Sequence, residues 1–132
     1  MRLWENIKKF FTSRSSIGSR AERAAACYLK KSKHLKVLAL NYRHSHYETD
    51  IVCYDKASDC IVFVEVKCRP LGAKVAGYYA ATSKRKKSNL KKSAIAFLRE
   101  NFAYGKNYRF DVVEVEHDEK GNFVNINHFE GF

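Results

Sequence analysis

Proline and glycine are scarce in this sequence, which has one Pro and six Gly among 132 residues. Hydrophobic residues make up 45% of the chain and aromatic residues 14%, so enough apolar surface is present to offset the entropy cost of ordering it. This composition excludes a disordered protein. A chain of this length buries roughly two thirds of its unfolded surface. We therefore expect one core that folds without a metal ion or a disulfide.

Long hydrophobic runs and closely spaced cysteines are also absent. No apolar run approaches the roughly 18 residues of a membrane-spanning helix, and residues 1–11 lack the uninterrupted apolar segment of a secretory signal. The four cysteines include no pair with the spacing of a structural zinc site, so we expect reduced thiols in the core. The sequence thus predicts a cytoplasmic protein with no transmembrane segment.

Acidic residues are in the minority. The chain has 14 Asp and Glu against 25 Lys and Arg, a formal net charge of +11. Such a charge favours polyanionic partners, with nucleic acid first and an acidic membrane surface second.

Residues 1–17 form a basic amphipathic N-terminal extension, in which Leu3, Ile7 and Phe10 recur at helical spacing. The pattern predicts a short helix followed by a serine-rich linker. This helix either docks on its own domain or a partner protein, or lies on a membrane surface. The domain proper is expected over residues 18–132.

The domain reads as helix, three strands, helix, two strands. Ser19 and Glu22 have the spacing of a capping box, which predicts a helix over residues 20–33. The other expected elements are strands over 35–43, 48–55 and 60–69, a long helix over 83–102, and strands over 108–116 and 123–129. Asp111, in the last long strand, is expected to form a structural ion pair.

Residues 56–59, Lys-Ala-Ser-Asp, predict a four-residue hairpin loop between the second and third strands. In the resulting register Asp50 lies opposite Glu65, and Glu48 lies opposite Lys67. Because side chains alternate with period two, all four would project from one face at one end of the hairpin. The group is either a surface salt-bridge ladder or a functional site.

Two neighbouring carboxylates suit a divalent cation with hard oxygen ligands, Mg²⁺ or Mn²⁺. A nearby lysine can orient the attacking water and stabilise charge on a phosphate. The pattern therefore points to a phosphodiesterase site.

The spacing of Asp50 and the strand end Glu65-Val66-Lys67 resembles the PD-(D/E)xK nuclease signature. The order of elements resembles the restriction-endonuclease-like core, which archaeal Holliday junction resolvases share. Five blocks in order resemble the YraN family of small bacterial proteins: Gly18-Ser19-Arg20-Ala21-Glu22, Asn41-Tyr42-Arg43, Glu48-Thr49-Asp50-Ile51, Val62-Phe63-Val64-Glu65-Val66-Lys67-Cys68-Arg69 and Arg109-Phe110-Asp111-Val112-Val113.

The resemblance implies an α/β restriction-endonuclease-like fold in three layers, with a central mixed sheet of about five strands flanked by helices. It implies a Mg²⁺- or Mn²⁺-dependent endonuclease that binds and cleaves DNA, including branched structures, and related nucleases often act as homodimers. Asp50 and Glu65 would be the metal carboxylates, the Val66 carbonyl a third ligand and Lys67 the catalytic lysine. Tyr47 stands where the family usually has Gly, which is expected to alter substrate fit.

Two further carboxylates have alternative roles. Glu22 lies where resolvase-like members of the fold place a carboxylate near the metal, but the capping box with Ser19 also explains it. Glu48 either supports the metal ligands from outside the coordination sphere or pairs with Lys67.

A basic cluster begins the long helix, and with Arg69 it forms the expected nucleic-acid-binding set. A helical wheel points Lys86 and Lys87 toward the sheet, and Arg85 and Lys92 outward. The cluster either contacts phosphate, helped by the helix N-terminus, or is a solvated surface. The loop over residues 69–82 contains Tyr78 and Tyr79, which either stack on unpaired bases or pack on the core. The binding set is Arg69, Lys84, Arg85, Lys86, Lys87 and Lys91.

Three functions thus compete. The first is a metal-dependent nuclease acting on DNA, favoured by the presence of Asp50, Glu65 and Lys67 together. The second is a nucleic-acid-binding module without catalysis. The third is an adaptor that holds a protein partner through the basic N-terminal helix.

Overall fold

The computed structural model describes residues 16–73, 84–103 and 105–131. The helix expected within residues 1–17, and most of the loop expected over residues 69–82 with its two tyrosines, lie outside these ranges. No helix in the described ranges is long and apolar enough to cross a lipid bilayer.

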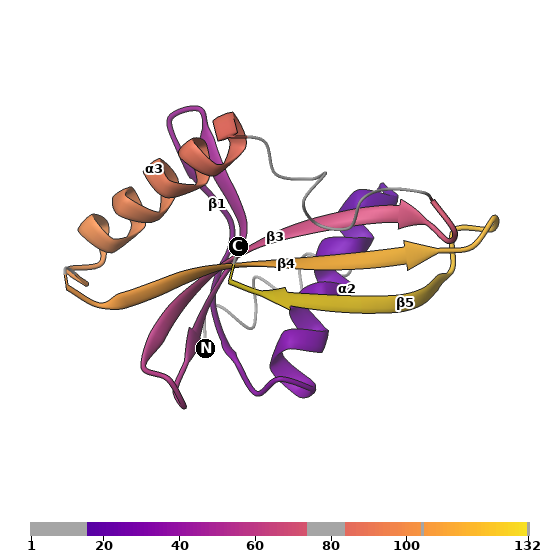
Figure 1. Ribbon diagram of the computed structural model, residues 1–132, viewed down its shortest axis with the longest axis horizontal. Helices are drawn as coiled ribbons and strands as arrows, with labels where there is room; N and C mark the ends of the chain where they lie inside the picture. Colours follow the sequence, from indigo (N-terminus) through magenta and orange to yellow (C-terminus); the bar gives the residue numbers. More distant parts are fainter. Residues whose placement is uncertain (1–15, 74–83, 104, 132) are drawn as a thin grey trace.

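Helices and strands follow one another in the order that the sequence predicts, and each boundary lies within three residues of its expected place (Figure 1). The elements are α2 (Ile17–Lys31), β1 (Lys36–His44), β2 (Tyr47–Asp55), β3 (Cys60–Pro70), α3 (Lys84–Glu100), β4 (Asn107–His117) and β5 (Phe123–Glu130).

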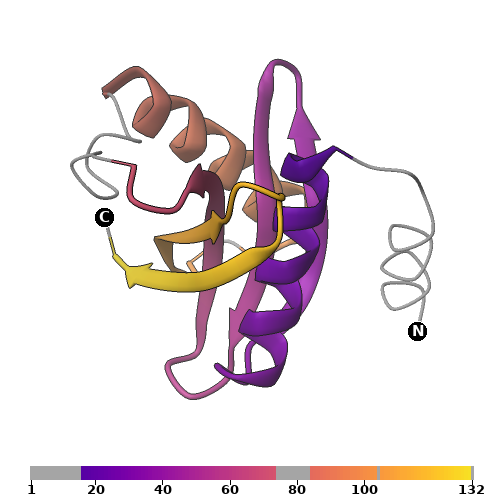
Figure 2. The ribbon, with the colours of Figure 1, turned by 90° about the vertical axis from the view of Figure 1, so that its right-hand side faces the viewer.

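The five strands form one mixed sheet in the order β1-β2-β3-β4-β5. Only β3 and β4 run parallel, because α3 carries the chain from one to the other. Figure 2 shows α2 on one face of the sheet and α3 on the other. This arrangement confirms the predicted three-layer α/β architecture.

Side chains of the central strands are apolar on both faces, which explains why both faces are covered. Val62 and Val64 of β3 pack with Leu29 of α2 in one core cluster. Phe63, between them in sequence, packs with Phe97 of α3 in a second cluster. The sheet is therefore buried between two separate cores, as the strand pattern predicts.

Helix α2 begins one turn earlier than expected. Its N-cap is Ser16, whose hydroxyl accepts a hydrogen bond from the backbone N–H of Ser19 at 3.3 Å. The prediction that Ser19 and Glu22 form the capping box is therefore wrong, since a serine one turn upstream already caps the helix. Glu22 lies inside the helix.

The predicted β2–β3 register is correct for part of the hairpin. Pairs run from Asp55–Cys60 at the loop to Ile51–Val64. The paired ladder ends there, so the expected continuation to Asp50 opposite Glu65 does not form.

The β2–β3 pairing ends where the Asp50 side chain, in place of a backbone carbonyl of β2, accepts the hydrogen bond from β3. Oδ2 of Asp50 accepts a hydrogen bond from the backbone N–H of Val66 at 2.8 Å. The next part of β2 pairs with β1 alone, with Arg43 opposite Glu48. The prediction that Glu48 lies opposite Lys67 is therefore wrong.

A buried polar network joins β4 to β5 and confirms the ion pair expected for Asp111. This fully buried carboxylate accepts hydrogen bonds from Arg109 Nε at 3.1 Å and from the backbone N–H of Gly131 at 3.1 Å, and it lies 2.8 Å from His128 Nε2. These contacts fix the C-terminal strand, on the face of the sheet that α2 covers.

Candidate active site

Asp50 lies where β2 parts from β3, and its carboxyl group is largely buried. Burial and the charge of Glu65 raise the pKa of Asp50 to about 7, although the hydrogen bond from Val66 opposes the shift. Glu22 raises this pKa further and Lys86 lowers it. Added positive charge next to this buried carboxyl group would favour its ionised form.

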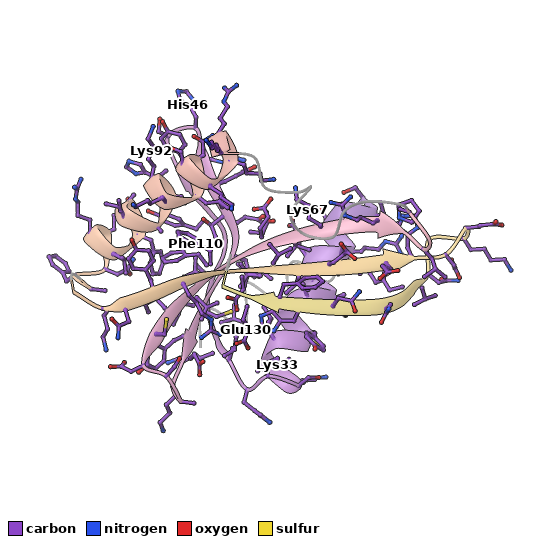
Figure 3. All side chains as sticks on the ribbon, in the orientation of Figure 1. Lys33, His46, Lys67, Lys92, Phe110 and Glu130 are labelled. Atoms are coloured by element: carbon purple, nitrogen blue, oxygen red, sulfur yellow. The ribbon has the colours of Figure 1, made fainter. Side chains whose placement is uncertain are left out.

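Glu65 lies between two lysines that come from different layers. Its Oε1 is 2.6 Å from Nζ of Lys86 on α3 and 3.5 Å from Nζ of Lys67 on β3. Only 10% of the Glu65 side chain is exposed. The predicted proximity of Glu65 and Lys67 is confirmed, and Lys86 reaches the same oxygen (Lys67 is labelled in Figure 3).

The two lysines differ in proton affinity. Burial lowers the pKa of Lys67, and the neighbouring Lys86 adds to this effect against the attraction of Glu65. Burial also acts to lower the pKa of Lys86, but its contacts with Glu65 and Lys67 and the charge of Asp50 raise it above the usual value. Lys86 is thus the stable counter-ion of Glu65.

Glu22 approaches the same carboxylates from the opposite helix layer. Burial raises the pKa of its half-buried carboxyl group, followed by the charges of Glu48 and Glu65. Glu22 and Asp50 also line one small hollow with Leu40. Because Glu22 is not a capping residue, its position fits the alternative that places it at the site.

Glu48 is the least enclosed of the four acids. Its Oε2 is 2.9 Å from Arg43 Nη2, and both side chains are mostly exposed. Its charge is therefore balanced by Arg43 rather than by Lys67. Glu48 still borders the site, since it lines the main hollow described next.

A hollow of about 290 Å³ opens between the β1–β2 hairpin, β3 and the start of α3. It brings the acids together with basic, aromatic and amide side chains. Its lining residues are His46, Tyr47, Glu48, Asp50, Glu65, Arg85, Lys86, Asn89 and Leu90. We call it the site hollow.

The lysine cluster is distributed differently from the helical-wheel prediction. Lys86 reaches the site as expected, but Arg85, predicted to point outward, lines the site hollow. Lys87 is exposed and lies outside the site hollow, but it lines a separate hollow with Phe110 of β4, in agreement with its predicted direction toward the sheet.

The other predicted basic residues lie outside the site hollow. Lys84 is exposed at the start of α3. Arg69 Nε is 3.4 Å from Oε2 of Glu114, and only 20% of the arginine side chain is exposed. This pair balances the charge of Arg69 within the protein, and the contact of Arg69 with nucleic acid stays a prediction. Lys92 contacts Tyr47, beside His46 at the end of the hairpin (Figure 3).

His46, Tyr47 and Asn89 line the hollow. Tyr47 was expected to alter substrate fit, whereas His46 and Asn89 were not among the predicted site residues. For Asn89 a signal exists, because it follows Arg85 and Lys86 by one helical turn and so shares their side of α3. Tyr47 directly precedes Glu48, and alternation along a strand points neighbours to opposite faces. Its position depends on the hairpin turn, which the strand pattern does not specify.

The donor set fits a hard divalent cation. Asp50 and Glu65 offer carboxylate oxygens, and the pKa of Asp50 is raised first by burial and then by the negative charge of Glu65, both of which a bound cation would offset. No group of three or more His, Cys, Asp or Glu suited to holding a metal is found in the described part of the chain. A cation here would need further oxygen ligands, such as water or phosphate, as Mg²⁺ commonly does.

Comparison with known proteins finds a family model and several relatives that carry the same family name. The model of "Uncharacterised protein family UPF0102" matches residues 21–115. A UPF0102 protein of Pelotomaculum thermopropionicum is 36% identical over 118 residues, which cover 89% of this chain and 95% of the relative. The relative from Carboxydothermus hydrogenoformans is 32% identical with the same two coverages. The one from Mycolicibacterium gilvum is 34% identical, over 90% of this chain and 94% of its own.

Among solved structures, a match is found with a repair endonuclease from Pyrococcus abyssi. The identity is 19% and the TM-score is 0.43. The match covers 83% of this chain but 42% of the endonuclease, so this chain spans less than half the length of that protein.

Proposed function

This chain belongs to the uncharacterised protein family UPF0102, the YraN family that its sequence blocks resemble, and we propose that it is a metal-dependent nuclease that binds DNA and hydrolyses its phosphodiester bonds. One observation carries the proposal. Asp50, Glu65, Lys67 and Lys86 meet at the point where β2 and β3 part, beside a hollow with basic residues.

Asp50 and Glu65 are proposed to hold one Mg²⁺ or Mn²⁺, with the Val66 carbonyl as a third ligand. Such an ion, when bound, supplies positive charge to a phosphate oxygen and makes a bound water more acidic. The hydrogen bond from Val66 N–H holds Asp50 against β3, so the aspartate and the Val66 backbone are fixed together. This fixed geometry reduces the reorganisation needed during reaction.

The lysines have separate roles in this proposal. Lys67 donates a hydrogen bond that orients the attacking water near Glu65. Lys86 balances the charge of Glu65 and holds it in place through their 2.6 Å contact. Glu22 adds negative charge from the α2 side and strengthens attraction for the cation.

Substrate phosphates are proposed to bind at the start of α3. Arg85 lines the site hollow, and Lys84 is exposed beside it in the first turn of the helix. Free backbone N–H groups at a helix start favour phosphate in addition to these charges. Contacts of this kind position the DNA backbone without reading its sequence.

A cleavage assay tests the proposal. Linear duplex, single-stranded, flap and four-way-junction DNA, with RNA counterparts, are incubated with Mg²⁺ or Mn²⁺. We expect metal-dependent cleavage of at least one DNA substrate, lost in Asp50→Asn, which keeps an oxygen to accept the Val66 hydrogen bond. Glu119→Gln, at an exposed turn residue, is the matched control and should cleave normally. Cleavage by Asp50→Asn at the wild-type rate would contradict the proposal.

A further inference from the structure

The site hollow has two chemically different ends. Toward β3 and the first turn of α3 it carries Asp50, Glu65 and Lys86, and at the β1–β2 turn it carries the aromatic residues Tyr47 and His46. A phosphodiester backbone needs only the first end. We propose that the second end takes one unpaired base of the DNA, stacked on Tyr47, next to the phosphate that is cleaved. This inference rests on the nuclease function proposed above.

Tyr47 is held in place without being covered. A two-residue turn, Ser45 and His46, joins β1 to β2 and sets Tyr47 opposite His44 as the first residue of β2. Nζ of Lys92 donates to the Tyr47 hydroxyl at 3.4 Å and lies 5.2 Å from the centre of its ring. The tyrosine remains partly exposed. A fixed, partly exposed ring is a stacking surface that loses little freedom when a base binds.

Asn89 supplies a polar group on the helix side of the hollow. Its amide group both donates and accepts, and it makes no hydrogen bond with another residue in the described ranges. Buried Leu90 provides an apolar wall next to it. A ring on one side, an apolar wall and an amide are the features that hold a base removed from its stack.

The consequence is a substrate preference. Bases inside a duplex are stacked on both faces, so a paired base cannot stack on Tyr47 unless it is first extruded. The structure therefore favours DNA with unpaired nucleotides, such as single strands and flaps, over intact duplex.

Binding measured without added metal tests this inference separately from cleavage. The probes are a flap DNA with 2-aminopurine at an unpaired position and the same sequence fully paired. We expect wild type to change the fluorescence of the unpaired probe, and Tyr47→Leu to lose affinity for it by roughly 5- to 150-fold, with little loss for the duplex. Tyr47→Phe keeps a ring and should retain most of the affinity.

Tyr54→Leu is the matched control. Tyr54 lies at the other end of β2, with Lys106 Nζ 5.7 Å from its ring centre and its hydroxyl 2.6 Å from Asp59. The lysine and tyrosine therefore repeat the Tyr47 arrangement away from the hollow. This variant should bind both probes as wild type does, and thermal unfolding will show that each variant is folded.

The outcomes separate the two proposals. Equal loss by Tyr47→Leu on both probes, retained affinity on both, or no binding of either probe by wild type overturns the base site. A loss confined to the unpaired probe supports it, even if no substrate is cleaved, in which case only the nuclease function fails.

Discussion

Burial of the Asp50 charge destabilises the folded protein. Its carboxyl group is buried at the end of the β2–β3 ladder, close to Glu65 and within the influence of Glu22. Residues of this kind reduce the stability of the folded protein in return for a function. The burial of Asp50 therefore has a consequence that can be measured without any substrate.

Asp50→Asn is expected to stabilise the metal-free protein at neutral and higher pH. Because folding raises the pKa of Asp50 from 3.8 to about 7, the folded state binds more protons than the unfolded state between these values. The free energy of unfolding of wild type therefore falls as pH rises through this window. The variant, which has no charge to bury, should be more stable by about 1 to 4 kcal/mol at pH 8.

Denaturant unfolding of both proteins across pH 4 to 9 measures this difference. The difference in free energy of unfolding between Asp50→Asn and wild type should increase up to about pH 7 and then level off. Added Mg²⁺ should narrow it by stabilising wild type alone. A gap that stays constant with pH would show that Asp50 is not electrostatically strained.

Lys86 and Lys87 are adjacent in sequence but have different surroundings, so a substitution of Lys87 is a control for the same substitution of Lys86. Lys86→Met removes the 2.6 Å partner of Glu65 and should lower the single-turnover cleavage rate at saturating DNA by about 100-fold. Lys87→Met, at an exposed residue outside the site hollow, should weaken DNA affinity and leave that rate unchanged. Equal saturated rates for the two variants would remove Lys86 from the active site.

At the scale of elements, the sequence predicts the order of the helices and strands and the β2–β3 register, but it does not predict where the pairing of β2 with β3 ends. The continuous apolar residues of β2 and β3 indicate two covered faces, and the short loop between the strands sets the correct pairing from Asp55 to Ile51. The ladder then ends because the Asp50 side chain bonds to the Val66 backbone. The pattern of apolar residues along a strand predicts which face each side chain occupies. It does not predict a hydrogen bond between a side chain and a backbone group that is distant in sequence.

The start of α2 was also mispredicted. Ser16 and Ser19 are both suitable capping residues, and only the structure shows that the first is used. The consequence reaches the site, because Glu22 is then free of a capping role and acts on the charges of Asp50 from its own face of the sheet. For α3, the helical wheel placed Lys86 correctly at the site. It did not show that exposed Arg85 lines the site hollow or that Lys87 lies outside it, because a helical period does not define which strand residues each side chain meets.

The β4–β5 network should govern stability and not chemistry. Asp111→Ala would leave Arg109, His128 and the Gly131 N–H without their buried partner. We expect a loss of about 3 to 5 kcal/mol in the free energy of unfolding, measured with urea. Asp59→Ala removes an exposed pair with Lys106 and should have a much smaller effect. Losses of equal size would mean that the Asp111 network is no stronger than a surface pair.

On the scale of the whole molecule, the site joins all three layers. Glu22 comes from α2, Asp50 and Glu65 from the sheet, and Lys86 from α3. The chain that carries this group of acids has a formal net charge of +11. Under the proposed function, the basic residues attract the DNA backbone over a distance set by the salt concentration, and the acids hold the cation.

The central claim is that Asp50 and Glu65 together hold a divalent cation. Calorimetric titration of Mn²⁺ into the protein with bound DNA tests it most directly, because substrate phosphate completes the ligand set. Wild type and the Glu119→Gln control should show the same saturable binding, and Asp50→Asn/Glu65→Gln should lose it while still binding DNA. Identical Mn²⁺ binding by wild type and the double variant would contradict the account.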